Sequence, residues 1–311
     1  MKPLPLQPGD KIAVVAPASV PRSMARFQAG VEQLRERGYD VEVGRPSYSR
    51  RGYLSGSDAE RLDELNAYLR RSDVKMLIAA RGGYGSLRLL EGIDYDAARA
   101  HPKLVVGYSD ITALHLALYE HAGLPGLSGP MVGVEWDQPE AASERLFWAL
   151  ARGDTPDPLL GPGGESLQPV REGTIDGVLL GGNLATIVRL LGTPYLPSLD
   201  GAILFVEDVG EEPYRIDAMF AQLHLSGLLD RLGGLVLGGF TDCEPADDLP
   251  SLSLNDIFDH YLSTAPYPVA RGLVYGHFPV KNTVPVGVRG RLRVNSDSAR
   301  LSVLEPVVDG R

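Results

Sequence analysis

Cysteine is nearly absent, since Cys243 is the single cysteine among 311 residues. One cysteine excludes an internal disulfide framework and a zinc or iron–sulfur site built on several thiolates. Long apolar runs are also missing: no segment approaches the roughly eighteen uninterrupted apolar residues of a membrane span. Prolines and the turn residues Gly9 and Asp10 interrupt the first twenty residues, which argues against a secretory signal. The sequence therefore predicts a cytoplasmic protein without a membrane segment.

Basic residues are scarcer than acidic ones, with 30 Lys and Arg against 40 Asp and Glu and a formal net charge of −10. Nucleic-acid-binding proteins usually present a basic face, so this balance argues against a nucleic-acid partner. Hydrophobic residues make up 44% of the chain, which is typical of a globular protein with a substantial core. A length of 311 residues suggests one large domain or two of ordinary size.

The first half alternates strand and helix patterns. Short apolar runs without polar alternation are typical of strands covered on both faces, and helix-length segments between them indicate parallel βαβ units. Residues 1–152 are therefore predicted to form a doubly wound, mostly parallel α/β domain, with Ser23 as the N-cap of its first helix. The predicted strands are 11–16, 39–43, 74–80 and 104–108, and the predicted helices are 23–37, 58–69 and 111–121.

A change in composition separates this half from the next. Residues 153–168 are dense in Pro, Gly and acidic residues, which is typical of a linker or long loop. Residues 169–311 are predicted to form a smaller, mixed α/β domain with a partly antiparallel sheet. Its predicted strands are 174–180, 202–207, 235–240, 292–294 and 301–304, and its predicted helices are 184–191 and 216–225.

Ser109 is the first residue with a pattern that suggests chemistry. It follows the predicted strand 104–108 and precedes a helix, and open α/β sheets place their ligands at such strand ends. A serine on a sharp strand-to-helix turn is a candidate nucleophile, and Gly107 would relieve crowding there. Ile111 stands where the full G-x-S-x-G pattern has its second glycine, so the match is partial. Ser109 as a plain helix N-cap is the alternative.

Two further strand ends carry groups that could act together with a serine. Glu207 ends an apolar strand, where it could orient a histidine, bind a metal or cap a helix. His277 is the one histidine of six in a Gly/Pro loop directly after a predicted apolar strand at 273–275, and no neighbouring metal ligands of suitable spacing accompany it. A general base is therefore the functional role that suits His277 best, and the sequence predicts no metal site and no cofactor.

Residues 81–86 form a glycine-rich segment at another strand end. Glycines let backbone N–H groups approach an anion closely. The segment lacks the Lys-Ser/Thr of a P-loop and the spacing of a dinucleotide fingerprint. The spacing alone does not distinguish three roles for this segment: an oxyanion hole, a phosphate-binding loop and a plain tight turn.

Taken in order, these segments resemble the LD-carboxypeptidase family of serine peptidases, which includes muramoyltetrapeptide carboxypeptidases and microcin C self-immunity proteins. The resemblance spans nearly the whole chain. It covers VVAPAS (14–19), RGGYG (81–85), GYSDITAL (107–114), GGNL (181–184), EDVGEEPYRID (207–217), LGGFTDC (237–243) and GH (276–277).

The resemblance implies a Ser-Glu-His triad with Ser109 as nucleophile, Glu207 as acid and His277 as base. It also implies an oxyanion hole made by backbone N–H groups of Gly82 or Gly83 and of Asp110. Because the serine falls in the first predicted domain and its partners in the second, the resemblance places the active site between the domains.

By the same resemblance, the substrate is a murein tetrapeptide that loses its C-terminal D-alanine, and the protein is a homodimer. Arg81 and Arg215 are candidates for binding this anionic muropeptide, although either could be a structural ion pair. Hydrolysis of peptidyl or aminoacyl adenylates is the alternative within the family, with Trp136 as a conceivable platform for adenine. A non-catalytic protein that binds a phosphate-bearing ligand at residues 81–85 is the alternative outside it.

Overall fold

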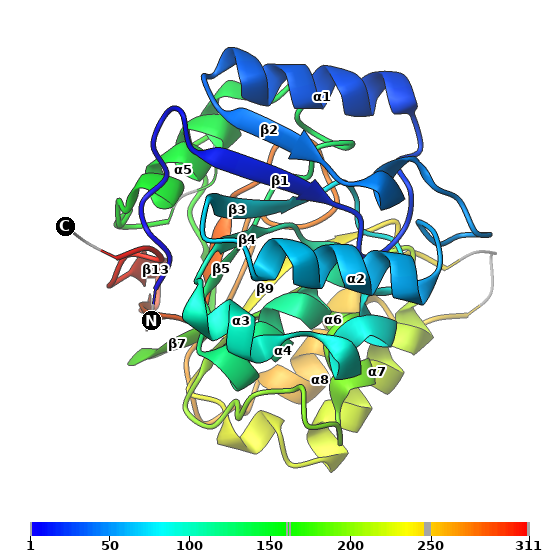
Figure 1. Cartoon of the computed structure of the whole chain (residues 1–311). Coiled ribbons are helices and arrows are strands. Elements are labelled where there is room, and N and C mark those ends of the chain that lie inside the picture. The colour runs from blue at the N-terminus through cyan, green and yellow to red at the C-terminus, as the bar shows by residue number, and fades with distance from the viewer. Residues whose placement is uncertain (1, 160, 162, 246–249, 310–311) are drawn as a thin grey trace.

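The computed structural model describes residues 2–159, 161, 163–245 and 250–309. The described chain folds into two β-sheets with helices packed against them (Figure 1). The strand order is β11-β5-β4-β3-β1-β2 in the first sheet and β13-β12-β7-β8-β9-β10-β6 in the second. The two ends of the described chain meet, since the N–H of Asp309 donates to the carbonyl of Pro3.

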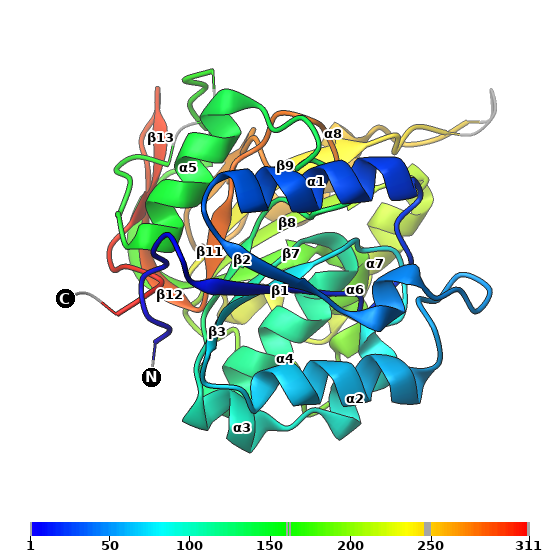
Figure 2. The same ribbon diagram turned by 45° about the horizontal axis from the view of Figure 1, so that its top comes forward.

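The first sheet is parallel apart from one edge strand. Its parallel strands are β1 (Lys11–Val15), β2 (Asp40–Val43), β3 (Val74–Ala79), β4 (Leu104–Val106) and β5 (Gly126–Ser128). Figure 2 shows α1 (Met24–Glu36) and α5 (Ala141–Arg152) on one face, and α2 (Asp58–Leu69), α3 (Tyr95–Ala100) and α4 (Thr112–Ala122) on the other. Helices on both faces of a parallel sheet confirm the predicted doubly wound architecture.

Local sequence explains why these helices begin where they do. Ser57 and Glu60 form a reciprocal capping box at the start of α2, which leaves fewer N–H groups unpaired in the first turn. Leu65 and Leu69 lie one helical turn apart on the buried face of α2. Ser23 accepts a hydrogen bond from the N–H of Arg26 and caps α1, as the sequence predicts.

The second sheet is mixed, which confirms the predicted character of the second half. Strands β7 (Gly173–Asn183), β8 (Ile203–Val209), β9 (Gly234–Thr241) and β10 (Val269–Arg271) are parallel. Strands β6 (Gln168–Arg171), β12 (Val288–Val294) and β13 (Ala299–Val303) pair antiparallel. The helices of this half are α6 (Leu184–Leu190), α7 (Pro213–Leu225) and α8 (Leu254–Leu262). Short 3₁₀ turns lie at Arg45–Tyr48, Ser86–Gly92, Ser109–Ile111 and Leu229–Arg231.

One strand from the second half joins the first sheet. Strand β11 (Val284–Val286) pairs antiparallel with β5, with Val284 opposite Ser128. The chain between β10 and β11, residues 272–283, therefore runs from the second sheet to the first as a loop, and the strand predicted at 273–275 is wrong: the nearest strand, β10, ends at Arg271. The predicted domain division at residue 152 and the linker 153–168 stay predictions. Within that linker, residues 160 and 162 lie outside the described residues, and Gln168 already begins β6.

A close contact joins α4 to the end of β7. The N–H of Asn183 donates to Thr112 Oγ1 at 3.0 Å. A Cβ on Gly182, whose φ is +140°, would lie 2.2 Å from the same oxygen, so only glycine fits at this approach. The start of α4, three residues after Ser109, is thereby held against the second sheet.

Candidate active site

Ser109 sits on a strained turn between β4 and α4. Its φ is +64°, a left-handed conformation that few non-glycine residues adopt. Such strain clusters at functional sites and persists where the surrounding structure over-determines the backbone. Gly107 makes the turn possible, because a Cβ there would lie 2.9 Å from Ile111 Cγ1 and 3.0 Å from Ala79 Cβ. Ser109 lines a cavity of about 730 Å³.

The glycine-rich segment after β3 borders the same cavity. A Cβ on Gly82 would lie 3.0 Å from Ser109 Cβ and 3.3 Å from Ser109 Oγ, so its backbone packs directly against the serine. Among the described residues, the N–H groups of Gly82 and Gly83 have no hydrogen-bond acceptor. Asp110 is buried, and its Oδ2 accepts a hydrogen bond of 2.8 Å from the N–H of Ser86. Asp110, the residue after the serine, therefore fixes the C-terminal end of the glycine-rich segment.

His277 and Glu207 form a direct pair. The Nδ1–H of His277 donates to Glu207 Oε2 at 2.7 Å, and the Glu207 side chain is completely buried. His277 lines the cavity that Ser109 lines. The structure thus brings together the three residues predicted from the sequence, with the serine on the first sheet's side and the other two on the second sheet's side.

Asp208, the neighbour of Glu207, has a different environment. Its Oδ1 accepts a hydrogen bond of 3.0 Å from the Asn183 side chain, and its Oδ2 accepts one of 2.8 Å from the N–H of Ala185. Burial raises the pKa of Asp208 to about 6. Asp208 therefore holds the start of α6 and does not contact the imidazole of His277.

The two arginines predicted to bind substrate occupy different places. Arg81 is half-buried and lines the cavity with Ser109; burial and the nearby Arg22 guanidinium lower its pKa. Arg215 is exposed at the start of α7, where it lies 3.7 Å from Glu211 and contacts the Tyr214 hydroxyl. It does not line that cavity.

Comparisons with known proteins identify the family of this chain. A family model for the LD-carboxypeptidase N-terminal domain matches residues 12–129, and one for the LD-carboxypeptidase C-terminal domain matches residues 176–292. The chain belongs to the LD-carboxypeptidase family. The resemblance predicted from the sequence is therefore confirmed. The N-terminal match contains Ser109, and the C-terminal match contains Glu207 and His277.

Individual members of the LD-carboxypeptidase family match over almost their full length. A probable murein peptide carboxypeptidase of Bacillus subtilis is 36% identical over 96% of this chain and 93% of its own. The crystal structure of a muramoyltetrapeptide carboxypeptidase from Oxalobacter formigenes superposes with a TM-score of 0.82 at 31% identity, covering 94% of this chain and 98% of its own. The microcin C7 self-immunity protein of Escherichia coli is 28% identical over 97% of this chain and 95% of its own.

The cavity also contains a cluster of polar residues to which the sequence assigns no role. Tyr108, Glu135 and Lys281 line the cavity around Ser109, and Glu135 contacts the other two. Tyr108 lies next to Ser109 in the sequence, and Lys281 follows His277 by four residues. This proximity is the only sequence feature that could have indicated that they line the site. Nothing in the sequence around Glu135 distinguishes it from a surface carboxylate.

Trp136 is a packing residue. It is 1% exposed, its indole N–H donates to the Pro130 carbonyl at 3.4 Å, and its ring contacts Phe147 and Trp148. It therefore presents no open face to a ligand.

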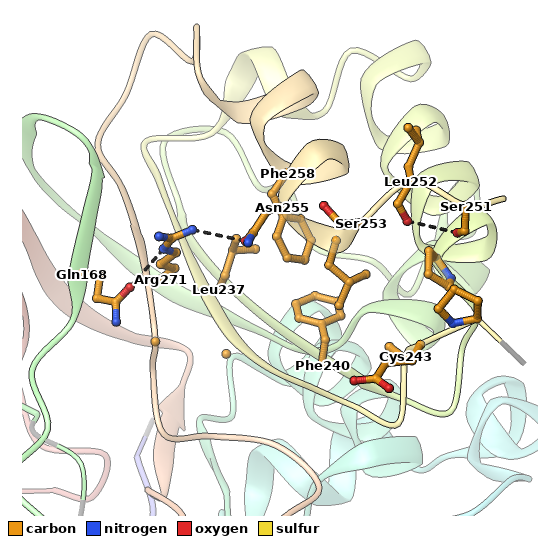
Figure 3. A pocket seen from close by; sticks show the side chains of 16 residues that line it. Gln168, Leu237, Phe240, Cys243, Ser251, Leu252, Ser253, Asn255, Phe258 and Arg271 are labelled. Atoms are coloured by element: carbon orange, nitrogen blue, oxygen red, sulfur yellow. Dashed lines mark hydrogen bonds between the residues drawn. The ribbon is translucent and has the colours of Figure 1, made fainter. Parts of the chain in front are cut away.

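A second cavity of about 730 Å³ lies beside α8 and β9, and the triad candidates do not line it (Figure 3). Leu237, Phe240 and Phe258 contribute apolar surface to it. Arg271 lies at one end, where it donates to Gln168 and Asn255.

Two general features concern the described residues as a whole. They contain no helix with the length and apolarity needed to cross a membrane. They also contain no group of three or more His, Cys, Asp or Glu side chains arranged to hold a metal ion. The predicted homodimer and cytoplasmic location stay predictions.

Proposed function

We propose that this protein is a serine-type LD-carboxypeptidase that removes the C-terminal D-amino acid, D-alanine, from murein tetrapeptides through a Ser109-Glu207-His277 triad. The observation that carries the proposal is that Ser109 and His277 line one cavity while His277 donates to the buried Glu207. The names of the Bacillus subtilis and Oxalobacter formigenes relatives support the substrate class.

The reaction would proceed through an acyl-enzyme. Ser109 Oγ attacks the carbonyl carbon of the scissile amide while His277 Nε2 takes the hydroxyl proton. The C–N bond then breaks, and His277 returns the proton to the departing D-alanine nitrogen. Water, deprotonated in turn by His277, attacks the ester carbonyl, releases the tripeptide acid and restores the serine.

Buried Glu207 is placed to stabilise the imidazolium that forms on His277 when it takes the proton of Ser109. Burying a carboxylate away from water costs free energy unless the carboxylate is paired. Glu207 is fully buried, and its Oε1 has no hydrogen-bond partner among the described residues. The positive charge that develops on the imidazole during proton transfer compensates the Glu207 charge. The pair therefore stabilises the transition state more than the resting state.

The glycine-rich segment is suited to bind the developing oxyanion. Gly82 packs against Ser109, and the N–H groups of Gly82 and Gly83 lack protein acceptors among the described residues. Donors held in place before the reaction stabilise the tetrahedral intermediate without reorganisation. Asp110 would add a third N–H from the residue after the nucleophile.

Arg81 is the candidate for recognition of a substrate carboxylate. Its guanidinium lines the cavity, and Arg22 lines it too, so an anion entering there would meet two positive charges. The alternative role, as a structural ion pair, would require a carboxylate partner, whereas the Arg81 guanidinium donates to the Val20 carbonyl at 3.3 Å.

Hydrolysis of acyl adenylates remains the second candidate, because the microcin C7 self-immunity protein is also a relative. The sequence offered Trp136 as its adenine platform, and burial of that ring argues against this role. A non-catalytic phosphate-binding protein would retain its function without Ser109.

The test is release of D-alanine from a murein tetrapeptide by the wild type and by Ser109→Ala, each with and without a chelator. The proposal expects release that survives the chelator and falls by at least about 10³-fold in the variant. No release by a folded wild type would contradict the murein substrate, and cleavage of an aminoacyl adenylate by the same preparation would support the second candidate.

A further inference from the structure

Glu135 lies at the centre of a buried polar cluster beside the candidate triad. Its Oε1 accepts hydrogen bonds from the Tyr108 hydroxyl at 2.8 Å and from Lys281 Nζ at 2.7 Å. Its Oε2 accepts one of 2.9 Å from the N–H of Met131. The side chains of Lys281 and Glu135 are only 3% and 12% exposed. We call Tyr108, Glu135 and Lys281 the carboxylate bridge.

The bridge connects the two chain segments that carry the nucleophile and the base. Tyr108 directly precedes Ser109, and Lys281 belongs to the same loop as His277, four residues later. The Tyr108 ring packs edge-on against the His277 ring with centroids 5.0 Å apart, and Lys281 Nζ lies 3.8 Å from the centre of the Tyr108 ring. Tyr108 is thus held between the base and the Lys281–Glu135 ion pair.

Other contacts fix the ends of the His277 loop to the first sheet. Tyr275 and Ser128 share a buried hydrogen bond of 2.6 Å, and the N–H of Lys281 donates to Ser143 Oγ at 3.1 Å. These contacts hold the loop backbone near β5 and α5. The carboxylate bridge is the one that reaches the residue next to the nucleophile.

Stability alone does not explain an ion pair in this place. The free-energy cost of removing two charges from water is about as large as the gain from their attraction. An apolar pair of similar volume often stabilises the fold equally well. A charged pair with a third hydrogen-bond partner has a narrow range of acceptable geometries. Alignment is therefore the property that distinguishes the bridge from an apolar contact.

We propose that Glu135 and Lys281 are positioning residues: through Tyr108 they hold the Ser109 turn in register with the His277 loop. The inference rests on the proposed triad. A misplacement of catalytic groups by about 1 Å can cost on the order of 10²-fold in rate. Loss of the bridge is therefore expected to lower kcat by about 10- to 100-fold while KM changes by less than about 3-fold.

The test compares Glu135→Gln, Lys281→Met and the double variant with the wild type. Three quantities are measured for each: Tm, kcat and KM for D-alanine release, and the rate at which a fluorophosphonate probe labels Ser109. Each single variant leaves one buried charge unpaired, whereas the double variant leaves none, so it should regain most of the lost Tm. The probe carries no substrate carboxylate, so its labelling rate reports the serine and base alone.

The proposal expects kcat and the labelling rate to stay at least about 10-fold low in the double variant, although its Tm recovers. Removing the exposed Arg291–Asp176 pair, by Arg291→Met with Asp176→Asn, is the matched control and should change neither rate.

Recovery of kcat together with Tm in the double variant would overturn the proposal, because the pair would then serve stability only. A rise in KM with unchanged labelling would also overturn it, because Lys281 would then bind substrate. A folded wild type that neither releases D-alanine nor is labelled at Ser109 would contradict the triad itself, and the bridge with it.

Discussion

His277 and Glu207 are 70 residues apart in the sequence, yet the imidazole Nδ1–H donates to the carboxylate at 2.7 Å. Gly276, directly before the histidine, has a φ of +148°, and a Cβ there would lie 3.2 Å from Phe278 Cε1 and 3.3 Å from the Gly239 carbonyl oxygen, so glycine suits this turn. Because Glu207 is fully buried, water does not compete for the oxygen that faces the imidazole. The pair fixes the ring so that Nε2 is the nitrogen left for proton transfer.

Glu207→Gln tests the charge in this pair while keeping the side-chain shape. We expect kcat to fall by about 10³- to 10⁴-fold, because an amide can hold the wrong imidazole tautomer and does not stabilise the imidazolium. The fold should survive, since the substitution removes a buried charge. Steady-state kinetics of D-alanine release and a thermal melt measure the two effects.

Asp208→Asn is the control for Glu207→Gln, because Asp208 is the adjacent buried carboxylate and it bonds Asn183 and Ala185. It should lower Tm and leave kcat within about 10-fold of the wild type. Equal kcat losses in the two variants would mean that the effect is structural.

Elements with strong local patterns could be predicted from the sequence, and non-local ones could not. The helix 58–69 is predicted to the residue from leucines at helical spacing, and the structure adds a capping box of Ser57 and Glu60 at its start. The helix Ala141–Arg152 was missed, although Glu140 caps it and its apolar residues repeat at helical spacing. Strand β11 was missed because it has three residues, contains Pro285 and pairs with β5 more than 150 residues earlier.

In the candidate site, too, the features set by local sequence could be predicted and those set by distant contacts could not. The turn at Ser109 could be predicted, because an apolar strand leads into Gly107 and a helix follows. Its left-handed φ could not, because tertiary contacts impose that conformation on a serine. The spacing of residues left Glu207 and His277 as separate candidates, and the family resemblance joined them. Glu135 was missed because its role depends on two partners from distant segments.

Gly82→Ala tests how closely the glycine-rich segment packs against the nucleophile. The added Cβ would lie 3.0 Å from Ser109 Cβ, which is tighter than ordinary contact, so the serine must shift. We expect kcat to fall by at least about 10-fold with a small change in Tm, because the strain falls on the catalytic turn. Stopped assays of D-alanine release at saturating substrate measure it.

Gly234→Ala is matched to Gly82→Ala in crowding, with Leu292 Cδ2 3.1 Å and Ile175 Cγ2 3.2 Å from the added atom. It lies in the core of the second sheet, so it should lower stability by about 1 kcal/mol and leave kcat unchanged. A Gly82→Ala enzyme with full activity would argue against the oxyanion role of this segment.

Arg81→Gln tests whether the half-buried guanidinium in the cavity binds a substrate carboxylate. We expect KM to rise about 10-fold or more with a smaller change in kcat, because the lost contact is made before and during the reaction alike. Arg215→Gln provides the comparison, since Arg215 is exposed and lies outside that cavity. If Arg215→Gln raises KM as much as Arg81→Gln does, the substrate extends over the start of α7.

His115 gives the fold a predictable dependence on pH. It is buried in α4, where its Nε2 lies 3.3 Å from the Val105 carbonyl and its Nδ1 has no partner among the described residues. Burial lowers the pKa of His115 from 6.5 to about 4. Above pH 6.5 both folded and unfolded chains carry a neutral ring, so the stabilisation is fully present. Between pH 6.5 and 4 the unfolded chain binds the proton first, and stability falls.

Replacing His115 with leucine removes this contribution to the pH dependence. At pH 4.5 the wild type should have lost about 2.5 kcal/mol more unfolding free energy, relative to pH 7, than His115→Leu has lost. Urea unfolding of both proteins at the two pH values measures this difference, and the other titrating groups cancel because both chains share them. Parallel pH dependences would mean that the His115 ring takes up a proton in the folded state, and that water reaches the interface between α4 and β4.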